Sequence, residues 1–145
     1  MTRNYTLLAI ILILLSACGN GKPKALEKFY ENIEIVSWDD ISSPEEDIDF
    51  TIKRWNAMPF MDTKRRIVKD LVKNYLKKGD RFNKDKFLEL ISYPLYEFES
   101  EKYVVLGYPI GKEIEDKLLV FFIIYEGKIY DTLFAKIKTY DAKFN

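Results

Sequence analysis

The sequence predicts an α+β domain of two layers, in which a helical hairpin packs on a three- to four-stranded antiparallel sheet. Apolar residues recur at helical spacing between residues 62 and 91, and the pattern then changes to branched and aromatic runs after residue 102. Helices followed by an antiparallel meander are typical of two packed layers, because each element must bury one apolar face. A third observation concerns the N-terminus, where an apolar run ends at the only cysteine.

The N-terminus has the pattern of a secretory signal. Arg3 precedes the uninterrupted apolar run Leu7–Leu15, which is nine residues long. That length suits the core of a signal peptide and falls short of the roughly 20 residues that span a bilayer. The small residues Ser16 and Ala17 follow, and then Cys18.

The stretch Leu15-Ser16-Ala17-Cys18 resembles the lipobox of bacterial lipoproteins. The resemblance implies that a lipid is attached to the Cys18 sulfur and that the signal is cut between Ala17 and Cys18. Two or three acyl chains would hold the protein on a membrane, because each buried methylene contributes about 0.8 kcal/mol. The alternative is an ordinary signal peptide with an incidental cysteine. We therefore expect a signal peptide over residues 1–17, a lipidated tether over 18–24 and a single domain over 25–145.

Composition narrows the functional classes. The chain has no histidine, which removes the usual general base, the usual zinc ligand and every Ser-His or Cys-His pair. Loss of residues 1–17 removes Arg3 and no acid, so 23 basic and 23 acidic residues become 22 and 23, a net charge of −1. Such a surface argues against nucleic-acid binding. We expect no catalysis, no cofactor and no metal.

The first part of the domain carries weak signals. Residues 25–33 can form a brief helix, and residues 33–38 alternate like a strand. Residues 39–50 contain six acids and Pro44, which indicates a loop. This acidic run invites a calcium site, but the alternation with a mid-loop glycine is missing, and a solvated loop is the alternative. Residues 50–55 read as a short extended piece.

The helical hairpin is clearer. One helix is expected from a cap at Asp62 or Thr63 to about Lys78, and a second from Asn83 to the Tyr93-Pro94 stop. Between residues 62 and 86 there are ten basic residues and four acids. This basic face could meet an anionic head group or an acidic partner, or it could be a solvated face partly neutralised by the acidic loop.

Three strands are expected next, at Lys102–Ile110, Lys117–Tyr125 and Lys128–Lys138, with Glu126-Gly127 as a tight turn between the last two. The middle strand is apolar on both faces, although a sheet with one wet face would alternate with polar residues. We expect Leu119, Phe121 and Ile123 to face the helices.

The opposite face then needs another cover. If it is open, an apolar patch would mark an interface, and the candidate partner-binding residues are Val120, Phe122, Ile124, Tyr130 and Phe134. The alternative is that residues 25–55, including Trp38, fold over this face as core. The strand Lys102–Ile110, if it is a free edge, would also allow strand addition.

From Trp55 onward the order of features resembles the BamE (SmpA/OmlA)-like lipoproteins, which share a fold with β-lactamase-inhibitor proteins. The stretches that carry the resemblance are RWNAMPFMDTKRRIVKDLVKNYLKKG, DKFLELISYPLYEFES, YVVLGYPIG and LLVFFIIYEGKIYDTLF. The corner Ile91-Ser92-Tyr93-Pro94 stands where the family has Leu-Gly-x-Pro, and the family's Gln-Gly-Asn motif has no counterpart after Cys18. The resemblance implies a small membrane-tethered binding module without catalysis.

These observations predict a lipid-anchored protein that binds a protein partner as an accessory of a cell-envelope complex. An inhibitor or immunity lipoprotein that blocks a secreted enzyme or toxin is the alternative from another class. The lipobox resemblance also bears on location. Gly19 follows the cysteine in place of the Asp that favours inner-membrane retention, so we expect the outer membrane, with the domain facing the periplasm.

Overall fold

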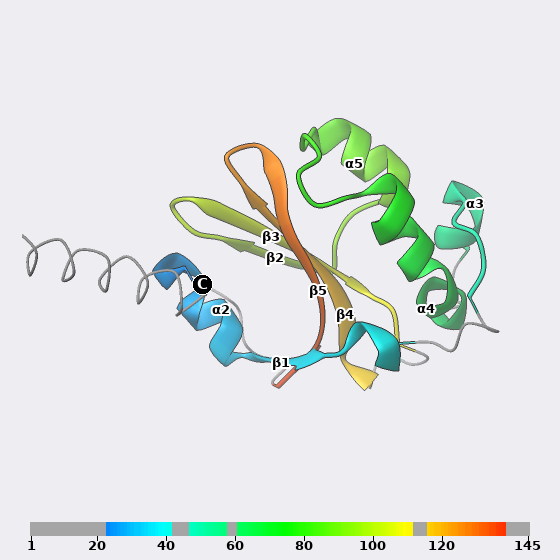
Figure 1. Ribbon diagram of the computed structural model, residues 1–145, viewed down its shortest axis with the longest axis horizontal. Coiled ribbons are helices and arrows are strands. Elements are labelled where there is room, and N and C mark those ends of the chain that lie inside the picture. Colours follow the sequence, from blue (N-terminus) through cyan, green and yellow to red (C-terminus); the bar gives the residue numbers. More distant parts are fainter. Residues whose placement is uncertain (1–22, 42–46, 58–60, 112–115, 139–145) are drawn as a thin grey trace, which may run out of the picture.

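The computed structural model describes residues 23–41, 47–57, 61–111 and 116–138 (Figure 1). The predicted signal peptide, Ala17 and Cys18 therefore lie outside the described residues, as do Glu45 and Glu46 of the acidic run. The helical elements are η1 (Lys24–Leu26), α2 (Glu27–Glu31), η2 (Trp38–Asp40), α3 (Ile52–Trp55), α4 (Met61–Asp70), the π-helix η3 (Leu71–Tyr75) and α5 (Lys84–Ile91). The strands are β1 (Ile33–Val36), β2 (Tyr96–Glu99), β3 (Tyr103–Pro109), β4 (Leu118–Tyr125) and β5 (Lys128–Ile137).

The sheet is antiparallel throughout, in the order β1-β5-β4-β3-β2. The α+β class and the three long strands are confirmed, but the sheet has five strands where three to four were expected. The additional strand is β2, which pairs with β3. Strand addition at Lys102–Ile110 required a free edge, and that condition is not met, because β3 is hydrogen-bonded on both sides. The edges are β1 and β2, each only four residues long, and short edges resist unwanted pairing.

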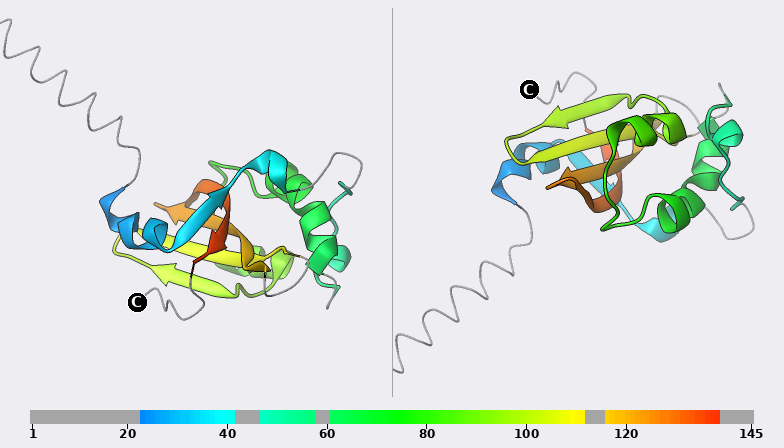
Figure 2. Two further views of the ribbon diagram at one scale, coloured as in Figure 1. Left: turned by 90° about the horizontal axis from the view of Figure 1, so that it is seen from below. Right: turned by 90° about the horizontal axis from the view of Figure 1, so that it is seen from above.

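Both faces of the sheet are covered (Figure 2). The helical hairpin of α4, η3 and α5 packs on one face, which we call the hairpin face. The short N-terminal helices η1 and α2 pack on the other, the N-terminal face, through Leu26 and Phe29, both 0% exposed. The cover of the second face is thus residues 24–31 and not the whole of residues 25–55. Ile41, Phe50 and Trp55 join the hairpin face, and Trp38 contacts Phe134 there, with ring centroids 4.8 Å apart.

The predicted assignment of β4 side chains to the two faces is wrong. Leu119, Phe121 and Ile123 lie on the N-terminal face, and Val120, Phe122 and Ile124 lie against the hairpin. Because every position of β4 is apolar, its residues carry no signal that decides which set meets which helices.

The helical hairpin forms near its predicted bounds. The Asn83 side chain accepts a hydrogen bond from the Lys86 amide at 3.2 Å, which caps α5. The first helix changes from α to π hydrogen bonding, since the Leu76 amide donates to the Leu71 carbonyl at 2.9 Å. Residues 52–55 were expected to be extended but form α3, because the Thr51 hydroxyl accepts from the Arg54 amide at 3.1 Å.

The corner after α5 holds a serine in a conformation that favours glycine. Ser92 has φ 66° and ψ −167°, at the position where the resembled family has glycine. Its amide donates to the Leu88 carbonyl at 2.8 Å, and its carbonyl accepts from the Tyr108 hydroxyl at 2.9 Å. Its hydroxyl is 2.6 Å from Oδ1 of Asn56. These contacts hold a backbone geometry that costs a non-glycine residue about 1–3 kcal/mol.

We expect Ser92→Gly to be more stable than Ser92→Ala by about 1–2 kcal/mol. Both variants lose the hydrogen bond to Asn56, so their difference reports the backbone strain, reduced by the larger entropy that glycine loses on folding. Urea titrations of the two variants, followed by tryptophan fluorescence, measure that difference. Equal free energies of unfolding would contradict a positive φ at this corner.

Candidate protein-binding surface

Four of the five predicted partner-binding residues are core residues. Val120, Phe122, Ile124 and Phe134 are at most 5% exposed and lie under the helical hairpin. Phe122 packs edge-on against Phe87, with ring centroids 5.2 Å apart. In this fold these four side chains therefore form no surface that a partner could contact.

The fifth residue, Tyr130, is on the other face of the sheet because of a β-bulge. Ile124 pairs with Ile129 and Ile123 pairs with Asp131, so Tyr130 is an extra residue between two ladder pairs. An extra residue reverses the alternation of side chains. Tyr130 is 39% exposed and lies on the N-terminal face.

Tyr130 belongs to a cluster of tyrosines near the turn between β4 and β5. Tyr103 and Tyr125 are cross-strand neighbours whose rings stack, with centroids 4.6 Å apart and an interplanar angle of 19°. The ring of Tyr130 is nearly perpendicular to both, and its centroid lies 5.7 Å from that of Tyr103 and 6.0 Å from that of Tyr125. Such aromatic pairs contribute more stability than the burial of their surface alone would give, so the three rings are well packed. We call Tyr103, Tyr125 and Tyr130 the tyrosine cluster.

Two hydroxyls of the cluster, those of Tyr103 and Tyr125, are held in their neutral form. Burial raises the pKa of Tyr103, with a smaller effect from the neighbouring Tyr130. A hydrogen bond with the Glu126 carboxylate raises the pKa of Tyr125. Raising the pKa of a phenol favours its neutral form, so these groups can donate hydrogen bonds to a bound molecule. Tyrosine and tryptophan, which combine a large ring with a polar group, are among the side chains that most often dominate protein interfaces.

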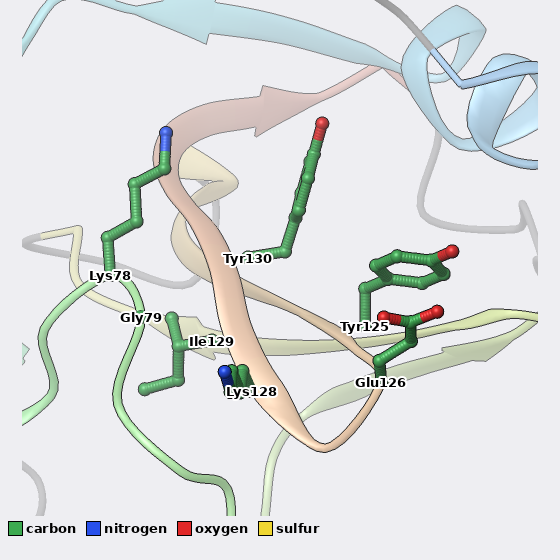
Figure 3. Close-up of a pocket in the computed structure, with 7 residues that line it drawn as sticks. All are labelled: Lys78, Gly79, Tyr125, Glu126, Lys128, Ile129 and Tyr130. Atoms are coloured by element: carbon green, nitrogen blue, oxygen red, sulfur yellow. The ribbon is translucent and has the colours of Figure 1, made fainter.

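Two hollows flank the tyrosine cluster. One has a volume of about 330 Å³ and lies between the β4–β5 hairpin and Lys78, as Figure 3 shows with Tyr125 and Glu126 side by side near the turn. The turn itself has Glu126 at φ 51° and Gly127 at φ 73°, which confirms the predicted tight hairpin. The other hollow, of about 480 Å³, includes Pro23, Lys24 and Tyr103. The second hollow therefore adjoins the point where the N-terminal tether would leave the domain.

The sequence contained only part of the signal for this surface. Tyr130 was singled out, but Tyr103 and Tyr125 were not. The Glu126-Gly127 turn fixes the start of the β4–β5 register, but the pairing of Tyr103 with Tyr125 needs the β3–β4 register as well. The bulge that brings Tyr130 to them has no sequence signature here, such as a glycine.

The acidic loop and the basic helix face, the two charged features of the sequence, contact each other. The acidic loop does neutralise part of the basic helix face, since Lys69 Nζ lies 4.0 Å from a carboxylate oxygen of Asp47. Asp70 accepts from the Phe50 amide at 2.6 Å. In the described ranges no three acidic or other metal-binding side chains gather into a cation site. No helix within the same ranges has the length and apolarity to cross a membrane.

Comparison of this chain with known protein families, with curated protein sequences and with solved structures gives no match.

Proposed function

We propose that this chain is a bacterial lipoprotein that is anchored through Cys18 and binds a protein partner as an accessory of a cell-envelope complex. The observation that carries the proposal is the stretch Leu15-Ser16-Ala17-Cys18 after an apolar run of nine residues. The first described residue, Pro23, follows Cys18 by five residues, and the first helical turn starts at Lys24. The domain thus starts a few residues after the proposed anchor. Gly19, in place of an Asp after the cysteine, supports the outer membrane as the location of the anchor, with the domain facing the periplasm.

The domain itself is proposed as a BamE-like binding module without catalysis. The order of a helical hairpin and a meander supports this, as does Ser92, which has a positive φ at the resembled family's glycine position. With no histidine in the chain and the only thiol carrying lipid, the side chains suit binding better than catalysis. The tyrosine cluster is the proposed contact surface, because it is aromatic, firmly packed and partly exposed.

A crosslinked pull-down of the lipidated protein from its own membranes, followed by mass spectrometry, tests this function. We expect envelope proteins at constant stoichiometry, and a loss of about tenfold in their recovery for Tyr130→Ala, since interface aromatics contribute ~1–2 kcal/mol or more. Tyr93→Ala is the matched control, because Tyr93 is 80% exposed and lies outside the tyrosine cluster. A single soluble enzyme or toxin in the eluate would instead favour the inhibitor class, and no specific protein would contradict both.

A further inference from the structure

A groove of about 280 Å³ lies on the hairpin face, where the ends of the two helices meet the start of β5. Its floor is apolar and consists of Leu76, Phe87 and Ile129, each at most 8% exposed, with the half-buried Leu90 beside them. Tyr75 forms part of its wall and is 49% exposed. A floor of this kind accepts one aliphatic or aromatic side chain.

The rim of the groove is basic. Arg81 and Lys86 are exposed, and within the described ranges neither forms an ion pair shorter than 4.0 Å. Asp80, the acid among the lining residues, accepts from the Lys77 amide at 3.0 Å, which ties its carboxylate to the end of the first helix. The exposed charges near these elements are Lys73, Lys77, Lys78, Lys84 and Lys128 against Asp85, Glu89 and Glu126. Positive charge is therefore in excess around the groove.

The groove is held in shape by the backbone. The link between the helices runs along β5, with hydrogen bonds from the Gly79 amide to the Ile129 carbonyl at 2.6 Å and from the Ile129 amide to the Asp80 carbonyl at 2.9 Å. The Phe82 amide donates to the Gly127 carbonyl at 2.8 Å. Arg81 thus stands on a paired segment, and a preformed site loses less entropy on binding.

The π turn is a second feature of this groove. It spans Leu71–Tyr75 and directly precedes Leu76 on the groove floor. π turns are rare in helices and occur often at functional sites. Tyr75, the last residue of this turn, is half-exposed beside the groove, and its ring contacts Phe50 with the centroids 4.9 Å apart.

We propose that this groove binds an acidic segment of the protein partner, with an apolar side chain on the floor and flanking carboxylates on Arg81 and Lys86. The inference rests on the proposed function and names the chemistry of the partner. Charge complementarity carries it, because Arg81 and Lys86 are exposed, form no ion pair with an acid of the described ranges, and line an apolar slot. The planar guanidinium of Arg81 suits a carboxylate, which it can bind through two hydrogen bonds.

The position of the groove favours a protein over the bilayer as occupant. The N-terminal helices cover the opposite face of the sheet (Figure 1), and the first described residue, Pro23, stands at their start. The five residues from Cys18 to Pro23 reach at most about 18 Å. So short a tether holds the N-terminal helices closer to the anchor than the groove, which lies on the opposite face of the sheet.

Selection from a random peptide library displayed on phage, against the lipidated full chain in detergent micelles, tests the groove. We expect the selected peptides to be rich in Asp and Glu around one aliphatic or aromatic residue. Their affinity should fall at least roughly tenfold for the double variant Arg81→Glu/Lys86→Glu. The matched control is Lys24→Glu/Lys102→Glu, which reverses two exposed charges at the hollow beside Pro23 and should keep the affinity for the selected peptides.

Several results would overturn the proposal. Selection of neutral or basic peptides, or of none, would do so, as would equal losses in the two double variants. The bilayer is tested with the protein anchored in phosphatidylcholine vesicles, with or without phosphatidylglycerol. Hydrogen-exchange protection of residues 79–90 that appears only with phosphatidylglycerol would assign the groove to lipid.

The pull-down separates this inference from the proposed function. Partner proteins captured equally by wild type and by Arg81→Glu/Lys86→Glu would overturn the groove and leave the function intact. Loss of the partner in that variant alone supports both. If neither chain captures a partner, the function fails, and the peptide selection still decides whether the groove binds acidic segments.

Discussion

Phe122→Glu is expected to abolish the folded state of the domain. Phe122 is 0% exposed and packs against Phe87 and Tyr108 beneath the hairpin, with ring centroids 5.2 and 6.0 Å away. A carboxylate there would have to lose its hydration or be protonated, and the aromatic contacts would also be lost. We expect a cost above about 5 kcal/mol, which is comparable to the whole stability of a small domain.

Circular dichroism and limited proteolysis of the variant measure this effect. The control is Tyr130→Glu, which introduces the same group at a half-exposed position of the same sheet and should keep the fold. A folded Phe122→Glu domain would mean that the hairpin does not cover this face of the sheet.

Phe29→Ala is expected to lower the free energy of unfolding by about 3–5 kcal/mol, the usual cost of truncating a buried phenylalanine. Phe29 is 0% exposed and contacts Phe121 at 5.1 Å and Phe98 at 6.2 Å between ring centroids. It therefore joins the N-terminal helix to β4 and β2. Urea denaturation followed by tryptophan fluorescence gives the value.

Glu31→Ala, an exposed position of the same helix, is the control for Phe29→Ala and should change stability by less than about 0.5 kcal/mol. A loss below about 1 kcal/mol for Phe29→Ala would mean that residues 24–31 are not part of the core. The N-terminal face of the sheet would then be open and available to a partner.

The elements with strong periodicity were predictable from the sequence. The two helices, the three long strands and the Glu126-Gly127 turn lie close to their expected bounds, because each combines an apolar pattern with a cap or turn residue. The strand β2 was missed because its four residues follow directly after a helix stop and alternate too briefly to count as a pattern. The helix α3 depends on a single cap from Thr51.

The surface was less predictable than the fold. An apolar strand such as β4 indicates that both of its faces are buried, but it does not indicate which elements cover them. The sequence therefore left open which of Phe121 and Phe122 faces the helical hairpin. The bulge at Tyr130 then moved one candidate to the opposite face. The groove at Arg81 depends on backbone pairing between two segments about fifty residues apart, which no local pattern encodes.

Metabolic labelling with a fatty-acid analogue, in cells that produce either the wild-type chain or Cys18→Ala, tests the anchor most directly. We expect a labelled, processed protein in the membrane fraction for wild type. For Cys18→Ala we expect an unlabelled precursor that keeps residues 1–17. Label that persists in Cys18→Ala, or a wild-type protein that is secreted without label, would contradict the lipid anchor on which the proposed function rests.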